Sequence, residues 1–219
     1  MPRTLRQIIP DHCYHVINRG NSRSRVFHEQ ADYAHFVALM REASDRVPLP
    51  VMAVCLMPNH LHLVVRPRES DDIARWTHWL FTTHVRRYHA KYKSNGRIWQ
   101  GRFKAFVIEG DAHLFAVMRY AERNALRAGL VARAEDWLWG SLRWRIRGSD
   151  SFPLAQPPIQ LPGNWIDYVN EAQSPDELEA LRACVNRQLP FGSRAWVEAK
   201  AKELGLVQSL HAIGRPANV

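Results

Sequence analysis

The segment 51–65 contains two apolar runs separated by the short turn Pro58-Asn59. Both runs are short and contain several β-branched residues, which predicts two strands of one hairpin. Pro58 presets φ at the first turn position, and Asn59 tolerates the left-handed conformation that a type II turn needs next. Because side chains alternate along a strand, we expect His60 and His62 on the same face of this hairpin.

Two imidazoles on one strand face can bind a divalent cation, because neutral imidazole is a common metal ligand. The simpler alternative is a pair of structural histidines, since a short His-x-His match recurs by chance. A structural zinc site is disfavoured, because no cysteine pair supports a closed tetrahedral set of ligands. The rest of the chain must therefore decide between a catalytic metal site and ordinary strand residues.

Composition restricts the classes of function. The chain has 219 residues, which suits one domain with an extension or two small domains. A formal net charge of +9 indicates a polyanionic partner, most often nucleic acid, although charge alone does not exclude a merely basic protein. No apolar run approaches the roughly 18 residues of a membrane span, and residues 1–6 lack the apolar segment of a secretory signal. Cys13, Cys55 and Cys184 have no Cys-x-x-Cys spacing, so we expect reduced thiols and a cytoplasmic protein.

Hydrophobic periodicity over the first 132 residues alternates between strand and helix patterns. Strands are expected at 12–17, 51–56, 60–65 and 98–109, and helices at 32–47, 71–92 and 110–129. Asp32 and Asp111 are the expected N-caps of two helices, and Gly129 is expected to end the last one. The order β-α-β-β-α-β is the split βαβ, ferredoxin-like arrangement. We therefore predict an α+β domain over 1–132, with the histidine strand central in an antiparallel sheet and the last helix packed across it.

Residues 133–219 have a different character and are predicted to form a helical extension and tail. The segment around Trp137, Trp139 and Trp144 suggests a short helix, and prolines between 153 and 162 mark a linker. Further helices are expected at 165–172, 175–189 and 193–204.

Between Ile73 and Ile108 the chain has eight basic residues and no Asp or Glu, with aromatic residues interleaved. Basic groups neutralise phosphates and aromatic faces stack on unpaired bases, although periodicity assigns about half of these aromatics to a core. The loop 18–25 adds three arginines that can bind phosphates. The residues expected to contact DNA are Asn18, Arg19, Asn21, Arg23, Arg86, Arg87, Lys91, Arg97, Trp99, Gln100, Arg102, Lys104, Arg123 and Arg127.

Tyr120 and Asn124 are four residues apart on the last predicted helix, so they share one helix face. A metal ion held by His60, His62 and the Asn124 amide oxygen would keep open positions for phosphate oxygens. Tyr120 could then attack the polarised phosphorus as a covalent nucleophile. A tyrosine on an amphipathic helix is more often a core residue, so this role depends on its neighbours. Protonation of free imidazoles predicts that activity falls below about pH 6.5.

These segments together resemble the HUH single-strand transposases, and most closely the REP-associated tyrosine transposases of bacteria. The resemblance spans residues 10–145. Its central parts are Asn18-Arg19-Gly20-Asn21, Met57-Pro58-Asn59-His60-Leu61-His62-Leu63, Trp99-Gln100 with Arg102-Phe103, and Tyr120 through Val131. Phe191-Gly192, Trp196 and Gly214-Arg215-Pro216 also look like the tail of that family. The family usually has proline after the asparagine, and because Ala125 stands there the helix can run on for another turn.

The resemblance implies a ferredoxin-like nuclease core with Mg²⁺ or Mn²⁺ at His60, His62 and Asn124. It also implies a single nucleophile, Tyr120, that cleaves single-stranded DNA and leaves a 5′-phosphotyrosine bond and a free 3′-hydroxyl. The implied substrate is a DNA hairpin of the REP or BIME type with a flanking tetranucleotide.

Two alternatives stay open at this point. The related insertion-sequence transposases exchange the tyrosine helix between subunits, whereas the long C-terminal extension of this chain favours a monomer over a dimer. A catalytically silent protein of the same fold that binds DNA hairpins would show the same basic surface, and cleavage of a labelled hairpin separates the two.

Overall fold

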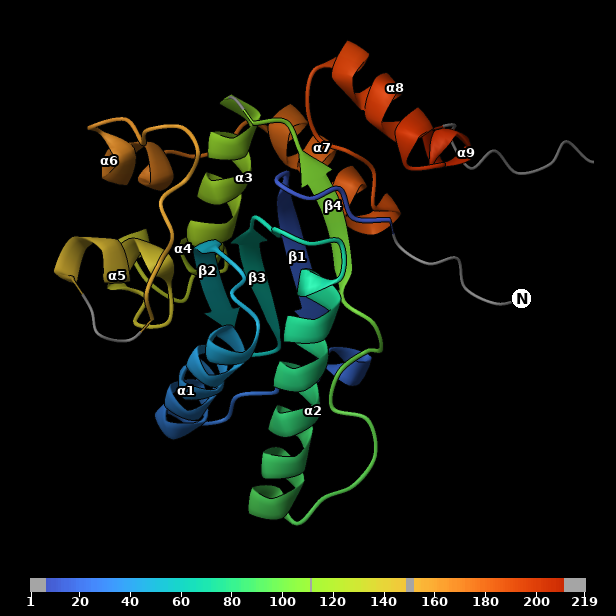
Figure 1. Cartoon of the computed structure of the whole chain (residues 1–219). Helices are drawn as coiled ribbons and strands as arrows, with labels where there is room; N and C mark the ends of the chain where they lie inside the picture. The colour runs from blue at the N-terminus through green and yellow to red at the C-terminus, as the bar shows by residue number, and fades with distance from the viewer. Residues whose placement is uncertain (1–6, 111, 149–151, 211–219) are drawn as a thin grey trace, which may run out of the picture.

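The computed structural model describes residues 7–110, 112–148 and 152–210. Four antiparallel strands form one sheet in the order β2-β3-β1-β4 (Figure 1). The strands are β1 Cys13–Arg19, β2 Val51–Met57, β3 His60–Val65 and β4 Lys104–Ile108. This strand order is the ferredoxin-like arrangement, so the predicted fold class and the central position of the histidine strand are confirmed.

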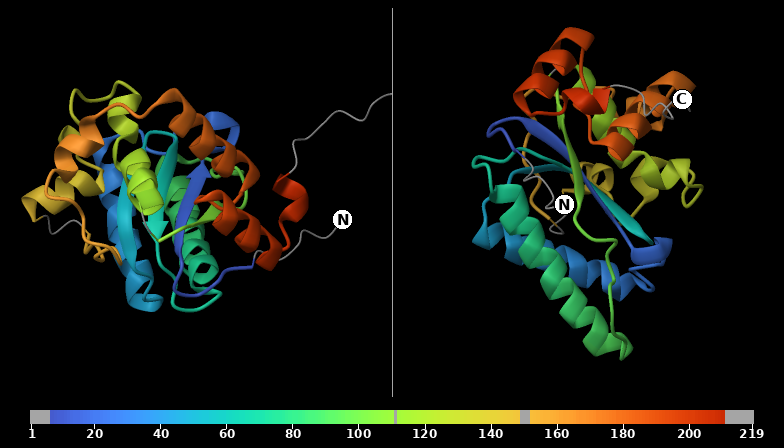
Figure 2. Two further views of the ribbon diagram at one scale, coloured as in Figure 1. Left: turned by 90° about the horizontal axis from the view of Figure 1, so that it is seen from above. Right: turned by 90° about the vertical axis from the view of Figure 1, so that its right-hand side faces the viewer.

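One face of the sheet is covered by α1 (Gln30–Arg46) and α2 (Asp72–Tyr92), which lie together on that side (Figure 2). Alternating strand residues such as Val16, Leu61 and Leu63 are buried against these helices. This core is the largest of the three hydrophobic clusters in the described structure.

The opposite face carries the histidines. It is covered by α3 (Ala112–Glu122) and α4 (Asn124–Arg127), which pack on β2 and β3. In the register of the sheet, Ile17 pairs with His62 and Arg19 pairs with His60. The alternation inferred from the sequence therefore holds, and both histidines face the helix that bears Tyr120.

Two expected element boundaries were wrong. The strand expected at 98–109 is regular only over β4, because Gly101 has φ +105° and turns the chain out of the extended conformation. The helix expected at 110–129 is interrupted at Arg123. The ψ angle of this residue is −5°, which departs from the α-helical value of about −42°, so α3 and α4 are separate helices. The helical segment ends as expected at Gly129, whose φ is +68°. The cap expected at Asp111 lies outside the described residues.

Two expected local conformations also need correction. Helix α1 begins at Gln30 rather than after Asp32. The Asp32 carboxylate instead accepts hydrogen bonds from the backbone N–H groups of His28 (2.7 Å) and Glu29 (3.2 Å). Among the described residues, positive φ at non-glycine positions is confined to Asp11, Ser22, Arg23, Lys93 and Gln188. Asn59 is not among them, so its turn is not of type II.

The C-terminal extension is helical, as predicted, and η2 and α9 are two short helices beyond those expected. Its elements are η2 Ala134–Asp136, α5 Ser141–Arg147, α6 Trp165–Asn170, α7 Pro175–Arg187, α8 Arg194–Glu203 and α9 Val207–Leu210. The extension lies along both edges of the sheet (Figure 1). At the β2 edge the Leu56 N–H donates to the Trp139 carbonyl, and at the β4 edge the Phe191 N–H donates to the Val107 carbonyl. Exposed strand edges pair readily with other chains, and the extension occupies both. The boundary between 1–132 and 133–219 stays a prediction.

No helix in the described ranges is long and apolar enough to cross a membrane. Cys13, Cys55 and Cys184 are all free and buried.

Candidate active site and nucleic-acid cleft

His60 and His62 project side by side from β3, with ring centroids 5.0 Å apart and ring planes at 77°. Each ring is oriented through its Nδ1 atom. His60 Nδ1 lies 2.7 Å from the Oδ1 of Asn59, and His62 Nδ1 lies 2.8 Å from the Nε2 of His15. When Nδ1 carries the proton, Nε2 presents a lone pair, which is the usual arrangement of a metal-binding histidine with an oriented second nitrogen.

Burial keeps these imidazoles neutral. Desolvation, followed by the fields of Arg19 and Arg127, lowers the pKa of His60 to about 4. Desolvation together with the neighbouring histidines and arginines lowers the pKa of His62 well below its ordinary value. These lowered pKa values predict that the decline of activity, expected below about pH 6.5 for free imidazoles, occurs in more acidic solution.

Tyr120 stands edge-on to His62 and to His15. Its ring centroid is 5.6 Å from that of His62 and 6.0 Å from that of His15, both in T-shaped geometry. The guanidinium carbon of Arg127 lies 4.1 Å from the centre of the Tyr120 ring. The fold therefore brings together His60, His62, Tyr120 and Arg127, which are up to 67 residues apart in the sequence (127 − 60).

Asn124 is the first residue of α4 and is only 5 % exposed. The next residue, Ala125, packs on Cys55 and Met57, which are the cross-strand partners of His62 and His60. The start of α4 thus lies over β2, next to the histidine strand. The interruption at Arg123 occurs although proline is absent, so the continuous helix expected from Ala125 does not form.

The donor set fits a hard or borderline divalent cation. The Nδ2 of Asn124 is buried without a hydrogen-bond partner in the described structure, so this side chain is not fully engaged by the protein. Two neutral imidazoles and an amide oxygen suit Mn²⁺ well and Mg²⁺ acceptably. In the described ranges, no group of three or more His, Cys, Asp and Glu side chains could hold a metal ion. The candidate set therefore depends on the amide.

The segment after β1 forms the wall beside the histidine turn. The Gly20 N–H donates to the Asn59 carbonyl (2.7 Å), and the Asn59 side chain donates to the Arg23 carbonyl (3.0 Å). A Cβ atom at Gly20 would lie 2.2 Å from the Ser24 carbonyl oxygen, so this position requires glycine. Through Gly20, the predicted Asn18-Arg19-Gly20-Asn21 motif therefore holds Asn59, whose side chain orients His60.

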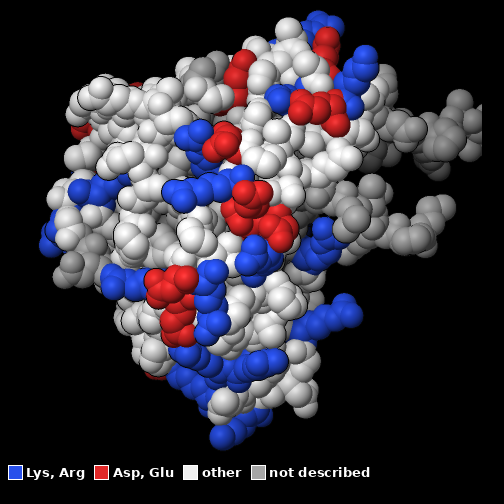
Figure 3. All heavy atoms as spheres, in the orientation of Figure 1, with Lys and Arg blue, Asp and Glu red and all other residues white. Residues whose placement is uncertain are grey.

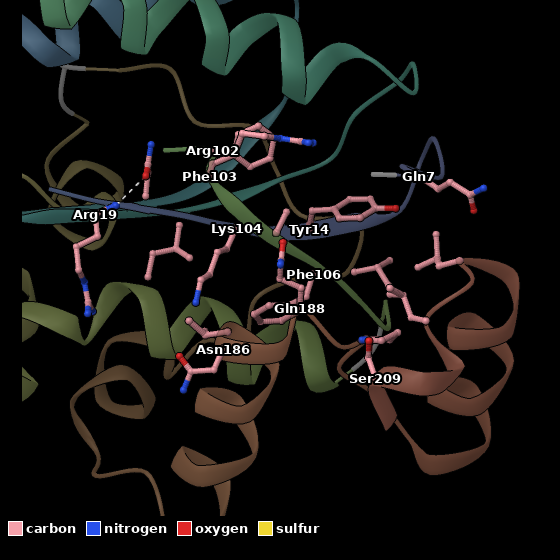
Figure 4. Close-up of a pocket in the computed structure, with 18 of the residues that line it drawn as sticks. Gln7, Tyr14, Arg19, Arg102, Phe103, Lys104, Phe106, Asn186, Gln188 and Ser209 are labelled. Carbon is pink, nitrogen blue, oxygen red and sulfur yellow. Dashed lines mark hydrogen bonds between the residues drawn. The ribbon is translucent and has the colours of Figure 1, made fainter. Parts of the chain in front are cut away.

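A cleft of about 680 Å³ opens along β4, between the sheet and the extension (Figure 4). Lys104 extends from β4 toward Asn186 of α7, and Arg19 lines the same cleft from the end of β1. No acidic residue is found among the described residues that line the cleft. Arg19 pairs with His60 across the sheet and Lys104 pairs with Ile17, the partner of His62, so the cleft adjoins the histidines. A strand of nucleic acid could follow this row of cations to the histidine pair.

A family model described as "Transposase IS200 like" matches residues 9–124. The chain belongs to that family.

Two relatives confirm the expected resemblance. A protein of Haemophilus influenzae (strain Rd) named as a REP-associated tyrosine transposase is 28 % identical over 122 residues, which is 50 % of this chain and 69 % of the relative. A solved structure of a REP-associated tyrosine transposase bound to a REP hairpin has a TM-score of 0.53, with 19 % identity over 80 % of this chain and 93 % of the other. At that identity the likeness supports the fold of this transposase.

Helix α2 carries three of the expected DNA contacts, Arg86, Arg87 and Lys91, and two of them are ion-paired within the protein. Helix α1 supplies the acids that the sequence lacks between Ile73 and Ile108, because Lys91 pairs with Glu29 and Asp32, and Arg87 pairs with Glu42 (3.3 Å). Lys and Arg gather over the lower end of α2 on the face in Figure 3, where acidic atoms lie just above them. Arg86, Arg87, Lys91, Arg97 and Arg102 are all exposed, but Arg87 and Lys91 also form ion pairs within the protein. This helix also lies on the sheet face opposite to the histidines.

Two more of the expected DNA contacts need correction. Trp99 is only 5 % exposed and packs among Phe27, Phe36 and Phe81, so it offers no free face to a base. Arg123 donates to the Asn170 carbonyl (2.6 Å) and thereby holds α6. The expected contacts that remain at the cleft are Asn18, Arg19, Gln100, Arg102 and Lys104, with Asn21 and Arg23 exposed in the adjoining turn.

His15 is the site residue that sequence reasoning missed. It is fully buried, and its pKa is lowered to about 3 by desolvation and by Arg127. The alternation of β1 could have revealed it, since His15 lies on the same strand face as Ile17, the partner of His62.

Proposed function

We propose that the chain is a metal-dependent single-stranded DNA endonuclease and strand transferase that acts through Tyr120. The observation that carries this proposal is the position of Tyr120, whose ring lies edge-on to His62, 5.6 Å away, within one chain. A tyrosine beside two neutral, oriented imidazoles has the requirements of a covalent nucleophile next to a phosphate-binding site.

The reaction exchanges one phosphoester bond for another. The Tyr120 oxygen forms a bond to phosphorus and loses its proton to solvent, while the bond from phosphorus to the 3′-oxygen breaks and that oxygen takes up a proton. The products are a 5′-phosphotyrosine and a free 3′-hydroxyl. A 3′-hydroxyl from another strand reverses the same step, so strands can be rejoined without ATP. Mg²⁺ or Mn²⁺ held by His60, His62 and Asn124 would supply Lewis-acid polarisation of the scissile phosphate.

The substrate we propose is a DNA hairpin of the REP or BIME type with a flanking tetranucleotide. The names of the two relatives support it. The cleft beside β4 supports single-stranded DNA next to the hairpin, because Arg19, Arg102 and Lys104 line it without an acid among its described residues. We place this reaction in the cytoplasm, consistent with the free cysteines.

We further propose that the active site acts in cis in a monomer, although a dimer would keep the same contacts. Tyr120 reaches the histidines of its own chain, so exchange of the tyrosine helix is not required. A mixture of Tyr120→Phe and His62→Ala proteins should therefore remain inactive, whereas exchange of tyrosine helices between subunits would restore cleavage.

The decisive experiment uses a fluorescent single-stranded oligonucleotide that carries a palindromic repeat from the host's intergenic DNA with its flanking nucleotides. Wild-type protein with Mn²⁺ should form a covalent adduct that survives a denaturing gel, and Tyr120→Phe should form none. Tyr168→Phe is the matched control, because Arg119 covers its ring at 4.3 Å, as Arg127 covers that of Tyr120.

Three results would count against the proposal. An adduct with Tyr120→Phe would exclude this nucleophile, and full wild-type activity in excess chelator would exclude the metal. Tight hairpin binding by the wild type without any adduct would favour the catalytically silent alternative.

A further inference from the structure

Arg127 is a half-buried cation that forms no ion pair with an acid among the described residues. Its guanidinium carbon lies 4.1 Å from the centre of the Tyr120 ring, and its Nη1 atom is buried with no hydrogen-bond partner in the described structure. Most buried donors are paired, so an unpaired guanidinium nitrogen requires an explanation. A ligand that arrives with its own negative charge would supply the missing acceptor.

The surroundings of Arg127 make it the cationic centre of the site. Its field contributes to the lowered pKa of His15, His60 and His62, which places all three rings within its electrostatic reach. Burial lowers the pKa of Arg127 itself, but a guanidinium remains charged at any pH at which the protein is folded. No acid among the described residues forms an ion pair with it, and the carboxylate of Glu122 is engaged by Ser141, Arg145 and Trp165.

A second arginine–tyrosine pair in the same fold shows what a purely structural arrangement looks like. Arg119 covers Tyr168 at 4.3 Å, which is nearly the same geometry. Two of its nitrogens have partners, since Nη2 donates to the Glu171 carbonyl (3.2 Å) and Nη1 lies 3.9 Å from the Glu177 carboxylate, while its Nε is buried without a partner in the described structure. Arg127 has the same stacking without these partners, so packing on a ring does not account for its position.

We propose that Arg127 is a further catalytic residue, whose guanidinium binds a non-bridging oxygen of the scissile phosphate beside Tyr120. It neutralises the charge that develops on this oxygen as the phenolic oxygen bonds to phosphorus and the 3′-oxygen leaves. A planar guanidinium with several donors matches phosphate geometry, and it acts most strongly where water is excluded. This inference rests on the proposed function, because it assigns a partner to the same nucleophile.

The test measures single-turnover adduct formation and hairpin affinity separately, on the oligonucleotide described above after its cleavage site has been mapped with wild-type protein. Arg127→Ala should slow adduct formation by about 100-fold or more, while affinity changes less than about threefold. Arg127→Lys keeps the charge but not the planar fork, so it should lie in between. Arg182→Ala is the matched control, since this exposed cation on α7 also acts on Arg127 but lies outside the site.

A substrate with a methylphosphonate at the scissile position separates charge neutralisation from packing. Its uncharged methyl group removes the negative oxygen that Arg127 would neutralise, so wild type and Arg127→Ala should react at rates within a few-fold of each other, with each stereoisomer tested separately. If Arg127→Ala is too unstable to assay, the same comparison is made with Arg127→Lys.

Other results would contradict either the role of Arg127 alone or the proposed function as well. Equal rates of wild type and Arg127→Ala on the natural phosphate, or an equal loss on both substrates, would overturn the role of Arg127 alone. Absence of any adduct from wild-type protein would overturn the proposed function and this inference together.

Discussion

The Nε2 atom of His15 lies 2.8 Å from the Nδ1 atom of His62, and the two rings are stacked with centroids 5.0 Å apart. His62 can present Nε2 to a metal only when its Nδ1 carries the proton and donates to His15. The partner on β1 therefore selects the tautomer of the candidate ligand on β3, in the way that outer partners orient metal-binding histidines.

We predict that His15→Ala weakens Mn²⁺ binding about 10- to 100-fold, because it removes the acceptor that fixes the His62 tautomer. His15→Gln should recover most of the affinity, since its amide oxygen can accept the same hydrogen bond. Mn²⁺ titration followed by electron paramagnetic resonance measures this without any DNA. The exposed His35 provides the control, and His35→Ala should bind Mn²⁺ as the wild type does. Unchanged affinity of His15→Ala would contradict the orienting role.

Electrostatic binding should depend on the cleft cations more than on helix α2. The sequence places Arg86, Arg87 and Lys91 among the expected DNA contacts and so predicts that their replacement by alanine flattens the salt dependence of affinity. The ion pairs of Arg87 and Lys91 with α1 instead favour the cleft.

We predict that the combined substitution of Arg19, Arg102 and Lys104 by alanine reduces the slope of log affinity against log salt by about 2, since each contact with single-stranded DNA contributes roughly 0.7. Fluorescence anisotropy of the labelled oligonucleotide at several salt concentrations measures the slope. Arg87→Ala serves as the comparison and should change it by less than about 0.5. A larger change of this slope in Arg87→Ala than in the cleft variant would indicate that the DNA binds on α2.

Several features of the fold could be predicted from the sequence. The hairpin, the two helices of one face and the central position of His60 and His62 follow from periodicity and turn residues, which act locally. The sheet order then follows, because few topologies satisfy that order of elements.

The remaining features depend on contacts between distant segments. The charge pattern of α2 predicted a free basic face, but the acids that pair with it come from α1, whose residues are about 60 positions away, as for Lys91 and Asp32. His15 has no local motif and becomes part of the site only through strand pairing. The interruption at Arg123 was not expected from helix propensity, and it places Ala125 on the strand next to the histidines.

Glu122 links the tyrosine helix to the extension. Its carboxylate is fully buried and accepts hydrogen bonds from Ser141 (2.6 Å), Arg145 (3.1 Å) and Trp165 (2.8 Å). We predict that Glu122→Gln lowers the free energy of unfolding by about 3 kcal/mol, because it leaves the largely buried Arg145 without its counter-charge. Glu198→Gln should change it by less than about 1 kcal/mol, since its partner Arg194 is 94 % exposed. Urea unfolding of both variants at pH 7 measures the difference, and similar midpoints would contradict it.

His84 gives the stability a defined pH dependence. It is buried among Phe27, Phe36 and Trp99, and its Nδ1 has no partner in the described structure. Desolvation lowers its pKa to about 4, although Asp32 acts in the opposite direction. In the unfolded chain the imidazole takes up a proton below about pH 6.5, whereas in the folded protein it does so only near pH 4. The stabilising contribution is therefore complete above pH 6.5 and is lost as the pH falls toward 4.

We predict that the free energy of unfolding decreases between pH 6.5 and 4 and that His84→Leu makes this decrease smaller, by up to about 3 kcal/mol over the interval. His15, His60 and His62 have lowered pKa values of the same sign, so part of the slope should remain. Urea titrations at a series of pH values measure the effect, with His78→Leu as the control because His78 is exposed on the same helix. A slope as steep in His84→Leu as in the wild type would show that the proton uptake of unfolding belongs to the histidines of the other sheet face.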